Sequence, residues 1–176
     1  DVTETVALAE LTRQAAQDMG GLGVLIANAA NDARHTLDDL TSNDWDACLA
    51  VNLKHQFFAV QAAHPIIASQ GGGSIICMGS IAWLNNTSEM IAYTTAKAGV
   101  HGLVRTLARQ LGPKNIRVNA LLPGWTMTER QLALWVDDNA RETIDSAQCL
   151  PGFVMSEDVA RMALFLAAGD SAMCAQ

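Results

Sequence analysis

The chain of 176 residues is poor in charge, in aromatic rings and above all in basic side chains. Only 16% of its residues are charged and 5% are aromatic, and 11 Lys and Arg stand against 18 Asp and Glu, for a net charge of −7. An acidic chain without a cluster of basic residues lacks the positively charged surface that binds nucleic acid or anionic lipid. No apolar run approaches the roughly 18–20 residues of a membrane span. We therefore expect no nucleic-acid and no membrane partner.

Cysteine is scarce and scattered as well. The four cysteines, Cys48, Cys77, Cys149 and Cys174, lie far apart and form no Cys-x-x-Cys pair. Zinc sites and disulfide frameworks both need closer spacing, so the sequence predicts reduced thiols, a cytoplasmic location and no metal site. Apolar residues, in contrast, make up 50% of the chain, which excludes a disordered protein because enough apolar surface is present to form a core.

The apolar pattern predicts helices alternating with short strands. Helical spacing covers residues 3–19, 43–69, 92–111 and 156–168, and short apolar runs predict parallel strands at 24–27, 74–78 and 116–122. We expect a buried stripe on the first helix, a central position for the first strand, and burial of the 43–69 helix on two sides. No element is predicted over 124–155. This order predicts a single α/β domain over 1–176, with a doubly wound parallel sheet and helices on both faces.

Small or turn-forming residues follow each predicted strand. Asn28-Ala29-Ala30 ends the first strand, Gly79-Ser80 follows the second, and Pro123-Gly124 follows the third. Ligands of open parallel sheets bind beyond the carboxyl ends of the strands, and small residues let the backbone approach a flat ligand. Short loops favour such residues for structural reasons too, but the three together favour a ligand site.

Tyr93 and Lys97 carry the sharpest chemical signal. Side chains four apart on a helix share one face, and an ammonium beside a phenol favours the phenolate, which would bring a pKa of about 10 towards neutrality. A phenolate can take the proton of an alcohol. Tyr93 is the only tyrosine in the chain, although a Tyr-x-x-x-Lys pair alone is weak evidence of catalysis.

The order Asn52, Ser80, Tyr93, Lys97 resembles the catalytic set of the short-chain dehydrogenase/reductase family. Asn28-Ala29-Ala30 is similar to the family's Asn-Ala-Gly strand end, with Ala30 in place of the usual Gly, and residues 116–119 are similar to the strand before its Pro-Gly motif. The resemblance implies a Rossmann-type fold and NAD or NADP as cofactor. It implies these cofactor-binding residues: Asp1, Val2, Asn28, Ala29, Ala30, Tyr93, Lys97, Pro123, Gly124, Trp125, Thr126 and Thr128.

The resemblance also implies a role for each catalytic side chain. Tyr93 would be the base, and Lys97 would lower the pKa of Tyr93 and bind the nicotinamide ribose. Ser80 would hold the reacting oxygen, and Asn52 would anchor a water in a proton relay towards Lys97.

Several short sequence segments are similar to segments of the family's sugar 1-dehydrogenases, which act on aldoses such as galactose, arabinose or xylose. They lie at 31–35, 52–55, 127–131, 134–135 and 147–150, and they imply oxidation of the anomeric hydroxyl of a sugar to a lactone. Candidate sugar contacts are Asp32, His35, Trp83, Glu129 and Trp135, although each is as readily a surface polar residue or a packed ring. Two alternatives stay open: another reductase of the family, such as one for 3-oxoacyl carrier proteins, and a non-catalytic nucleotide-binding or scaffold protein.

The family's Gly-rich pyrophosphate turn, its first two strands and its last strand have no counterpart in these 176 residues. We therefore expect an incomplete domain that is inactive as it stands and prone to aggregate. The choice between NAD and NADP, normally set at the end of the second strand, is not readable. Family members commonly pair the helices that correspond to 43–69 and 92–111, so the resemblance implies a homodimer or homotetramer when the protein is full length.

Overall fold

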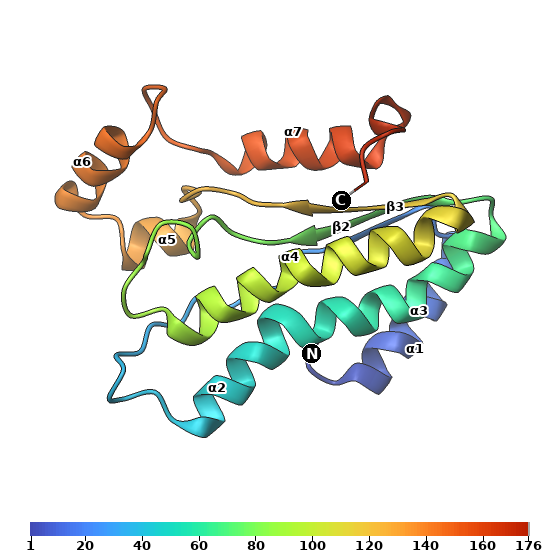
Figure 1. Ribbon diagram of the computed structural model, residues 1–176, viewed down its shortest axis with the longest axis horizontal. Helices are drawn as coiled ribbons and strands as arrows, with labels where there is room; N and C mark the ends of the chain where they lie inside the picture. Colours follow the sequence, from blue (N-terminus) through green and yellow to red (C-terminus); the bar gives the residue numbers. More distant parts are fainter. Residues whose placement is uncertain (176) are drawn as a thin grey trace.

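A three-stranded parallel sheet forms the centre of the computed structural model, which describes residues 1–175 (Figure 1). Strands β1 (Val24–Ala27), β2 (Gly73–Met78) and β3 (Ile116–Leu121) are hydrogen-bonded in that order. Ile26 stands opposite Ile76, and Ile76 opposite Asn119. Because the strands are parallel, their carboxyl ends lie at the same end of the sheet. Helices α5 (Glu129–Leu134) and α6 (Asp138–Ala147) lie beyond this end in Figure 1.

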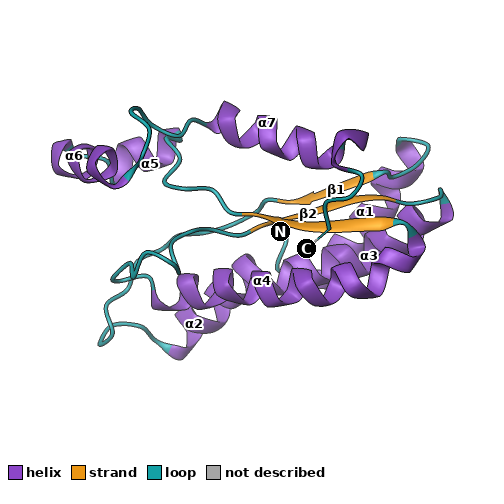
Figure 2. Ribbon diagram, turned by 45° about the horizontal axis from the view of Figure 1, so that its top comes forward, coloured by secondary structure: helices purple, strands orange, loops and turns teal. Residues whose placement is uncertain are grey.

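Helices cover both faces of the sheet (Figure 2). Helices α3 (His55–Ser69) and α4 (Ile91–Leu111) lie on one face, and α7 (Ser156–Ala167) lies on the other. The main core is formed between the sheet and the α3–α4 layer, where Ile67, Ile75, Val100 and Val118 are almost completely buried. The predicted α/β architecture with helices on both faces is confirmed.

The segment predicted as one helix over 43–69 is divided into three parts. It comprises α2 (Ser42–Leu49), a π-helical turn at Ala50–Lys54, and α3, which continues past Pro65. Thr41 caps α2: its hydroxyl accepts from the Asp44 N–H, and the Asp44 carboxylate accepts from the Thr41 N–H. The π turn was not predicted, because it changes the helical phase by one residue without a distinctive composition.

Two burial predictions at the start of the chain are wrong. Helix α1 (Thr5–Asp18) buries only Ala16, while Val6 is 80% and Leu11 64% exposed. Strand β1 is at an edge of the sheet rather than at the centre that its apolar run predicts, and its Val24 and Ile26 are partly exposed. The reason is that α1 packs mainly against α3, and β1 has a strand partner on one side only. This unpaired edge agrees with the expectation that the family's first two strands have no counterpart in these residues.

Short elements occupy much of the remaining chain. Helices α5 and α6 lie within the 124–155 stretch for which no element was predicted, and 3-10 turns cover Gly112–Lys114 and Gly169–Ser171. Thr128 and Asp137 cap α5 and α6 through their side chains. Within residues 1–175, no helix has the length and apolarity needed to cross a membrane.

Candidate active site

The four side chains of the predicted catalytic set converge beyond the carboxyl end of β2. Asn52 comes from the π turn, Ser80 is the second residue after β2, and Tyr93 and Lys97 lie in the first turns of α4. Lys97 follows Tyr93 by about one helical turn, and its Nζ is 5.6 Å from the centroid of the Tyr93 ring. The structure therefore brings together, from three segments, the residues that the sequence singled out.

Asn52 fixes the loop that follows β1. Its side chain is fully buried, its Oδ1 accepts from the Asn31 N–H (3.0 Å), and its Nδ2 donates to the carbonyls of Asn31 and Cys48 (both 2.9 Å). Such π turns often occur at functional sites, where the extra residue changes the direction of a side chain. Here the turn places Asn52 where it satisfies both main-chain groups of Asn31.

Lys97 is almost completely buried, and its Nζ donates to the Met78 carbonyl at 2.7 Å. Burial lowers the pKa of Lys97 to about 8, because an ammonium loses hydration in the interior. The lysine is therefore still largely protonated at neutral pH. One of its three N–H groups donates to the carbonyl of Met78 at the end of β2.

The direction of the Tyr93 pKa differs from the one expected. Burial of the phenol raises the pKa of Tyr93, the Ser80 hydroxyl beside it opposes this rise, and the charges of Asp32 and Cys48 add to it. The physical reason is that the phenol is largely removed from water while the Lys97 ammonium is bound to the Met78 carbonyl.

A cavity of about 430 Å³ lies along the carboxyl ends of the strands, beside α7. Four of the proposed cofactor-binding residues line it, namely Asn28, Pro123, Thr126 and Thr128, together with Met78 and Ile26. Its position and size suit a flat cofactor ring, since ligands of parallel sheets bind at this edge and ligand pockets are typically about 300–1,000 Å³. Of the other cofactor candidates, Ala29, Ala30, Gly124 and Trp125 adjoin the lining in sequence.

Asp1 and Val2 lie outside that cavity. The Asp1 carboxylate accepts from the Thr3 N–H (2.9 Å) and hydroxyl (3.0 Å), ahead of α1. No described contact links them to the catalytic side chains.

Asp32 and Trp135, two of the sugar-contact candidates, belong to one cluster that joins the loop after β1 to α5. The Asp32 carboxylate accepts from Gln131 Nε2 (2.6 Å) and Arg130 Nε (3.2 Å), and Gln131 Oε1 accepts from Trp125 Nε1 (2.7 Å). The Arg34 guanidinium lies 3.9 Å from the centroid of the Trp135 ring, a cation–π contact. The negative charge of Asp32 also contributes to raising the pKa of Tyr93, after burial of the phenol.

The other three sugar-contact candidates are dispersed. The His35 N–H donates to the Glu89 carbonyl, which anchors the loop just ahead of α4. Trp83 lies beside His101 of α4, with ring centroids 6.1 Å apart. Glu129 is exposed at the first position of α5.

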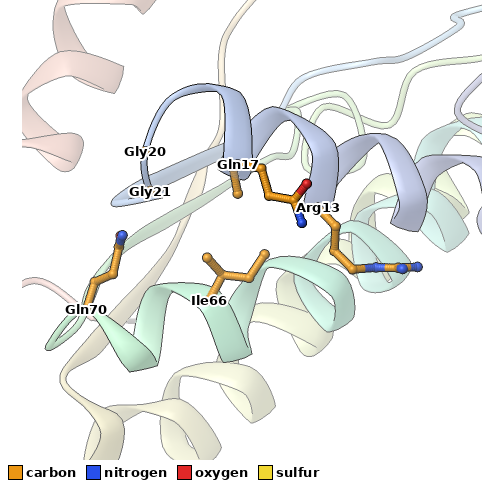
Figure 3. A pocket seen from close by; sticks show the side chains of 7 residues that line it. Arg13, Gln17, Gly20, Gly21, Ile66 and Gln70 are labelled. Carbon is orange, nitrogen blue, oxygen red and sulfur yellow. The ribbon is translucent and has the colours of Figure 1, made fainter.

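A second cavity, of about 360 Å³, lies between α1 and α3 (Figure 3). Arg13 and Gln17 of α1 face Ile66 and Gln70 across it. Gln70 Oε1 accepts from the Leu22 N–H at 2.9 Å, ahead of the amino end of β1. This cavity is therefore at the opposite end of the strand from the catalytic set.

Comparisons with known proteins show the family of this chain. A family model described as enoyl-(acyl carrier protein) reductase matches residues 1–175. The probable galactose dehydrogenase GalD of Rhizobium meliloti is 45% identical over 98% of the chain, and the D-xylose 1-dehydrogenase of Caulobacter vibrioides is 43% identical over 89%. The chain belongs to the short-chain dehydrogenase/reductase family.

A solved structure of the same family shows the same fold. The 7α-hydroxysteroid dehydrogenase complexed with NADH and 7-oxo glycochenodeoxycholic acid matches 99% of the chain with a TM-score of 0.94 and 27% identity. The chain covers 68% of that structure, 67% of the galactose dehydrogenase and 63% of the xylose dehydrogenase. It therefore spans about two thirds of the length of these relatives.

Sequence reasoning missed three residues of this short-chain dehydrogenase/reductase site. Gln56 contacts the π turn and the end of β2, Gln131 binds Asp32, and Arg34 covers Trp135. Gln56 could have been found, because it follows Asn52 by four residues and therefore shares its helical face. Arg34 and Gln131 had no such signal, since their partners are about a hundred residues away in sequence.

Proposed function

We propose that the full-length protein containing this chain is an NAD(P)-dependent dehydrogenase that oxidises the anomeric hydroxyl of an aldose to a lactone. The observation that carries this proposal is the convergence of Asn52, Ser80, Tyr93 and Lys97 at the carboxyl end of β2. Lys97 donates there to the carbonyl of Met78, a residue that lines the cavity at the strand ends. The galactose and xylose dehydrogenases among the relatives support an aldose as the substrate.

Each side chain of the set has a defined task in this reaction. Tyr93, as phenolate, takes the proton of the anomeric hydroxyl, and the Ser80 hydroxyl holds the same oxygen. The Lys97 ammonium stabilises the phenolate once it is turned towards Tyr93, and Asn52 keeps the loop after β1 in place. Asn28, Pro123, Thr126 and Thr128 would hold the nicotinamide half of the cofactor. When bound, the oxidised nicotinamide supplies the acceptor for the C1 hydride.

The test is an assay of the full-length protein with a panel of aldoses and either NAD or NADP. We expect reduced nicotinamide and lactone to form in equal amounts with at least one aldose. Turnover of a 3-oxoacyl thioester with NADH or NADPH instead would favour the alternative reductase, which is supported by the 3-oxoacyl-[acyl-carrier-protein] reductase FabG of Thermotoga maritima, 35% identical over 97% of the chain. No turnover of either class would contradict both.

The Tyr93→Phe variant tests the assigned base. It keeps the ring and removes the phenolic oxygen, so we expect turnover to fall by roughly 10²- to 10⁴-fold, the usual contribution of a general base. Cofactor affinity, measured by nicotinamide fluorescence, should change little. Near-normal turnover by a folded Tyr93→Phe protein would exclude Tyr93 as the base.

A further inference from the structure

We propose that Gln56 is a positioning residue for Lys97, with its amide nitrogen anchored on two main-chain carbonyls and its amide oxygen the acceptor for a second Lys97 proton. The kinetic consequence of this role depends on the proposed function. The proposed hydrogen bond from Lys97 to Gln56 does not, because it needs no substrate, only a turn of the Lys97 ammonium, which in this structure donates to the Met78 carbonyl.

The anchoring side of Gln56 is explicit in the structure. Its Nε2 donates to the Asn52 carbonyl (3.0 Å) and to the Met78 carbonyl (3.2 Å), and the residue is fully buried. Lys97 Nζ donates to the same Met78 oxygen at 2.7 Å. Gln56 Nε2 and Lys97 Nζ therefore cannot be farther apart than the sum of their two distances to that oxygen.

The amide oxygen of Gln56 is the part of the side chain that is still available to accept a hydrogen bond. Oε1 is buried and accepts no hydrogen bond within the described chain. The two carbonyls define the orientation of the amide, because a flipped amide would place Oε1 against two other acceptors. A buried acceptor without a donor is unfavourable, and Lys97 keeps two N–H groups that the Met78 carbonyl does not use.

The other groups around Lys97 are poorer partners for an ammonium. Cys48 on α2 and Cys77 on β2 face it as thiols, and burial raises the pKa of both, that of Cys77 to about 12. His55 on α3 is buried and neutral, since burial and the Lys97 charge lower its pKa to about 4. Tyr93 on α4 contributes its ring to the same space. The Gln56 amide oxygen is thus the acceptor best suited to hold the ammonium.

Replacing the Gln56 amide by an apolar group or by a carboxylate should shift the Lys97 pKa in opposite directions. Gln56→Met keeps the length but removes the acceptor, so the ammonium is less stable and the Lys97 pKa falls, by about one pH unit for a lost hydrogen bond to a charged group. Gln56→Glu places a carboxylate near Nζ, so the Lys97 pKa rises.

The measurement is an NMR titration of isotope-labelled lysine side chains in the full-length protein, without substrate, with the Lys97 signal assigned from a Lys97→Met variant. Gln61→Met is the matched control, because Gln61 is an exposed glutamine on the same helix. We expect a downward shift for Gln56→Met, an upward shift for Gln56→Glu and none for Gln61→Met. In enzyme that turns over an aldose, the alkaline limb of the kcat/KM profile should move in the same directions.

The proposal would be overturned if the pKa of Lys97 were the same in Gln56→Met as in Gln61→Met. If Gln56→Met does not fold, Gln56→Glu decides: in the pH range where the new carboxyl is ionised, as its own carbon signal reports, the absence of an upward shift also overturns the proposal. The two predicted shifts without turnover of any aldose would support the role of Gln56 and reject the proposed substrate.

Discussion

At the scale of single residues, three polar side chains are buried on the α3–α4 side of the site, those of His55, Gln56 and Lys97. His55 is 2% exposed, and neither of its ring nitrogens has a hydrogen-bond partner in the described structure. Next to it Gln56 is anchored on two carbonyls, and Lys97 is bound to one of the same carbonyls. The uncharged form of His55 is compatible with this interior, whereas the protonated ring would lose hydration and repel the Lys97 ammonium.

His55 should therefore make folding sensitive to mild acid. Its pKa is about 4 in the folded protein against 6.5 as its ordinary value, so the unfolded chain binds more protons between these pH values. The free energy of unfolding then decreases as pH falls from 6.5 towards 4, by up to about 3 kcal/mol. We expect His55→Phe to lose this part of the pH dependence in urea titrations.

The exposed His101→Phe variant is the control for that experiment, since it removes a histidine without removing a buried one. Parallel pH dependences in wild-type and His55→Phe protein would show that His55 is not the group responsible.

At the scale of elements, α5 is held to the rest of the molecule by side chains rather than by a packed core. It has only six residues and no buried one. Its connection to the loop after β1 consists of the Asp32 carboxylate with Gln131 and Arg130, and of Arg34 stacked on Trp135. The Arg130–Asp32 ion pair is half exposed on the arginine side, so it contributes little by itself. The shorter Gln131 bond is the stronger link.

Gln131→Met should loosen α5 measurably. It removes the bonds to Asp32 and Trp125 together, and loss of a hydrogen bond to a charged group is worth about 1.5–3 kcal/mol, or roughly 10- to 100-fold in the population of the open form. We expect trypsin to cleave after Arg130 faster by a similar factor, and the KM for the sugar to rise. The control is Ala133→Met, which introduces the same side chain at an exposed position of the same helix. Equal cleavage rates in the two variants would contradict this role of Gln131.

At the scale of the whole molecule, α1 and β1 expose apolar side chains, as does α7 on the other face of the sheet. Val6, Leu11 and Met19 are at least 64% exposed, and β1 presents an edge with Val24 and Ile26 partly exposed. An edge strand of apolar residues can pair with a second chain, and a large exposed apolar patch favours association. The 176-residue chain should consequently associate with itself through this region.

A lysine at Val24 should reduce that association, because a charge on an edge strand opposes pairing with another strand. Leu37→Lys adds the same charge at a position that is 80% exposed in a loop. We expect light scattering of the 176-residue chain to decrease in Val24→Lys and to stay near the wild-type value in Leu37→Lys. Equal decreases would show that net charge, and not the β1 edge, controls association.

The sequence by itself predicted the three strands, the four long helical segments and the positions of the proposed catalytic residues along them. All three strands and the four long helical segments were predicted within a few residues, because their apolar periodicity is local. Tyr93 and Lys97 share a face for the same reason, and Ser80 follows a strand end because the strand before it is unambiguous.

Only the tertiary structure decided what these residues contact. It placed β1 at an edge, inserted the π turn at Asn52, and satisfied Asp32 with Gln131, which is 99 residues away. It also directed the Lys97 ammonium to the Met78 carbonyl and raised the pKa of Tyr93, against expectation. Burial and charge environment depend on neighbours that are distant in sequence, whereas periodicity depends on neighbours a few residues away, so the periodic elements were predictable and the electrostatics of the candidate site were not.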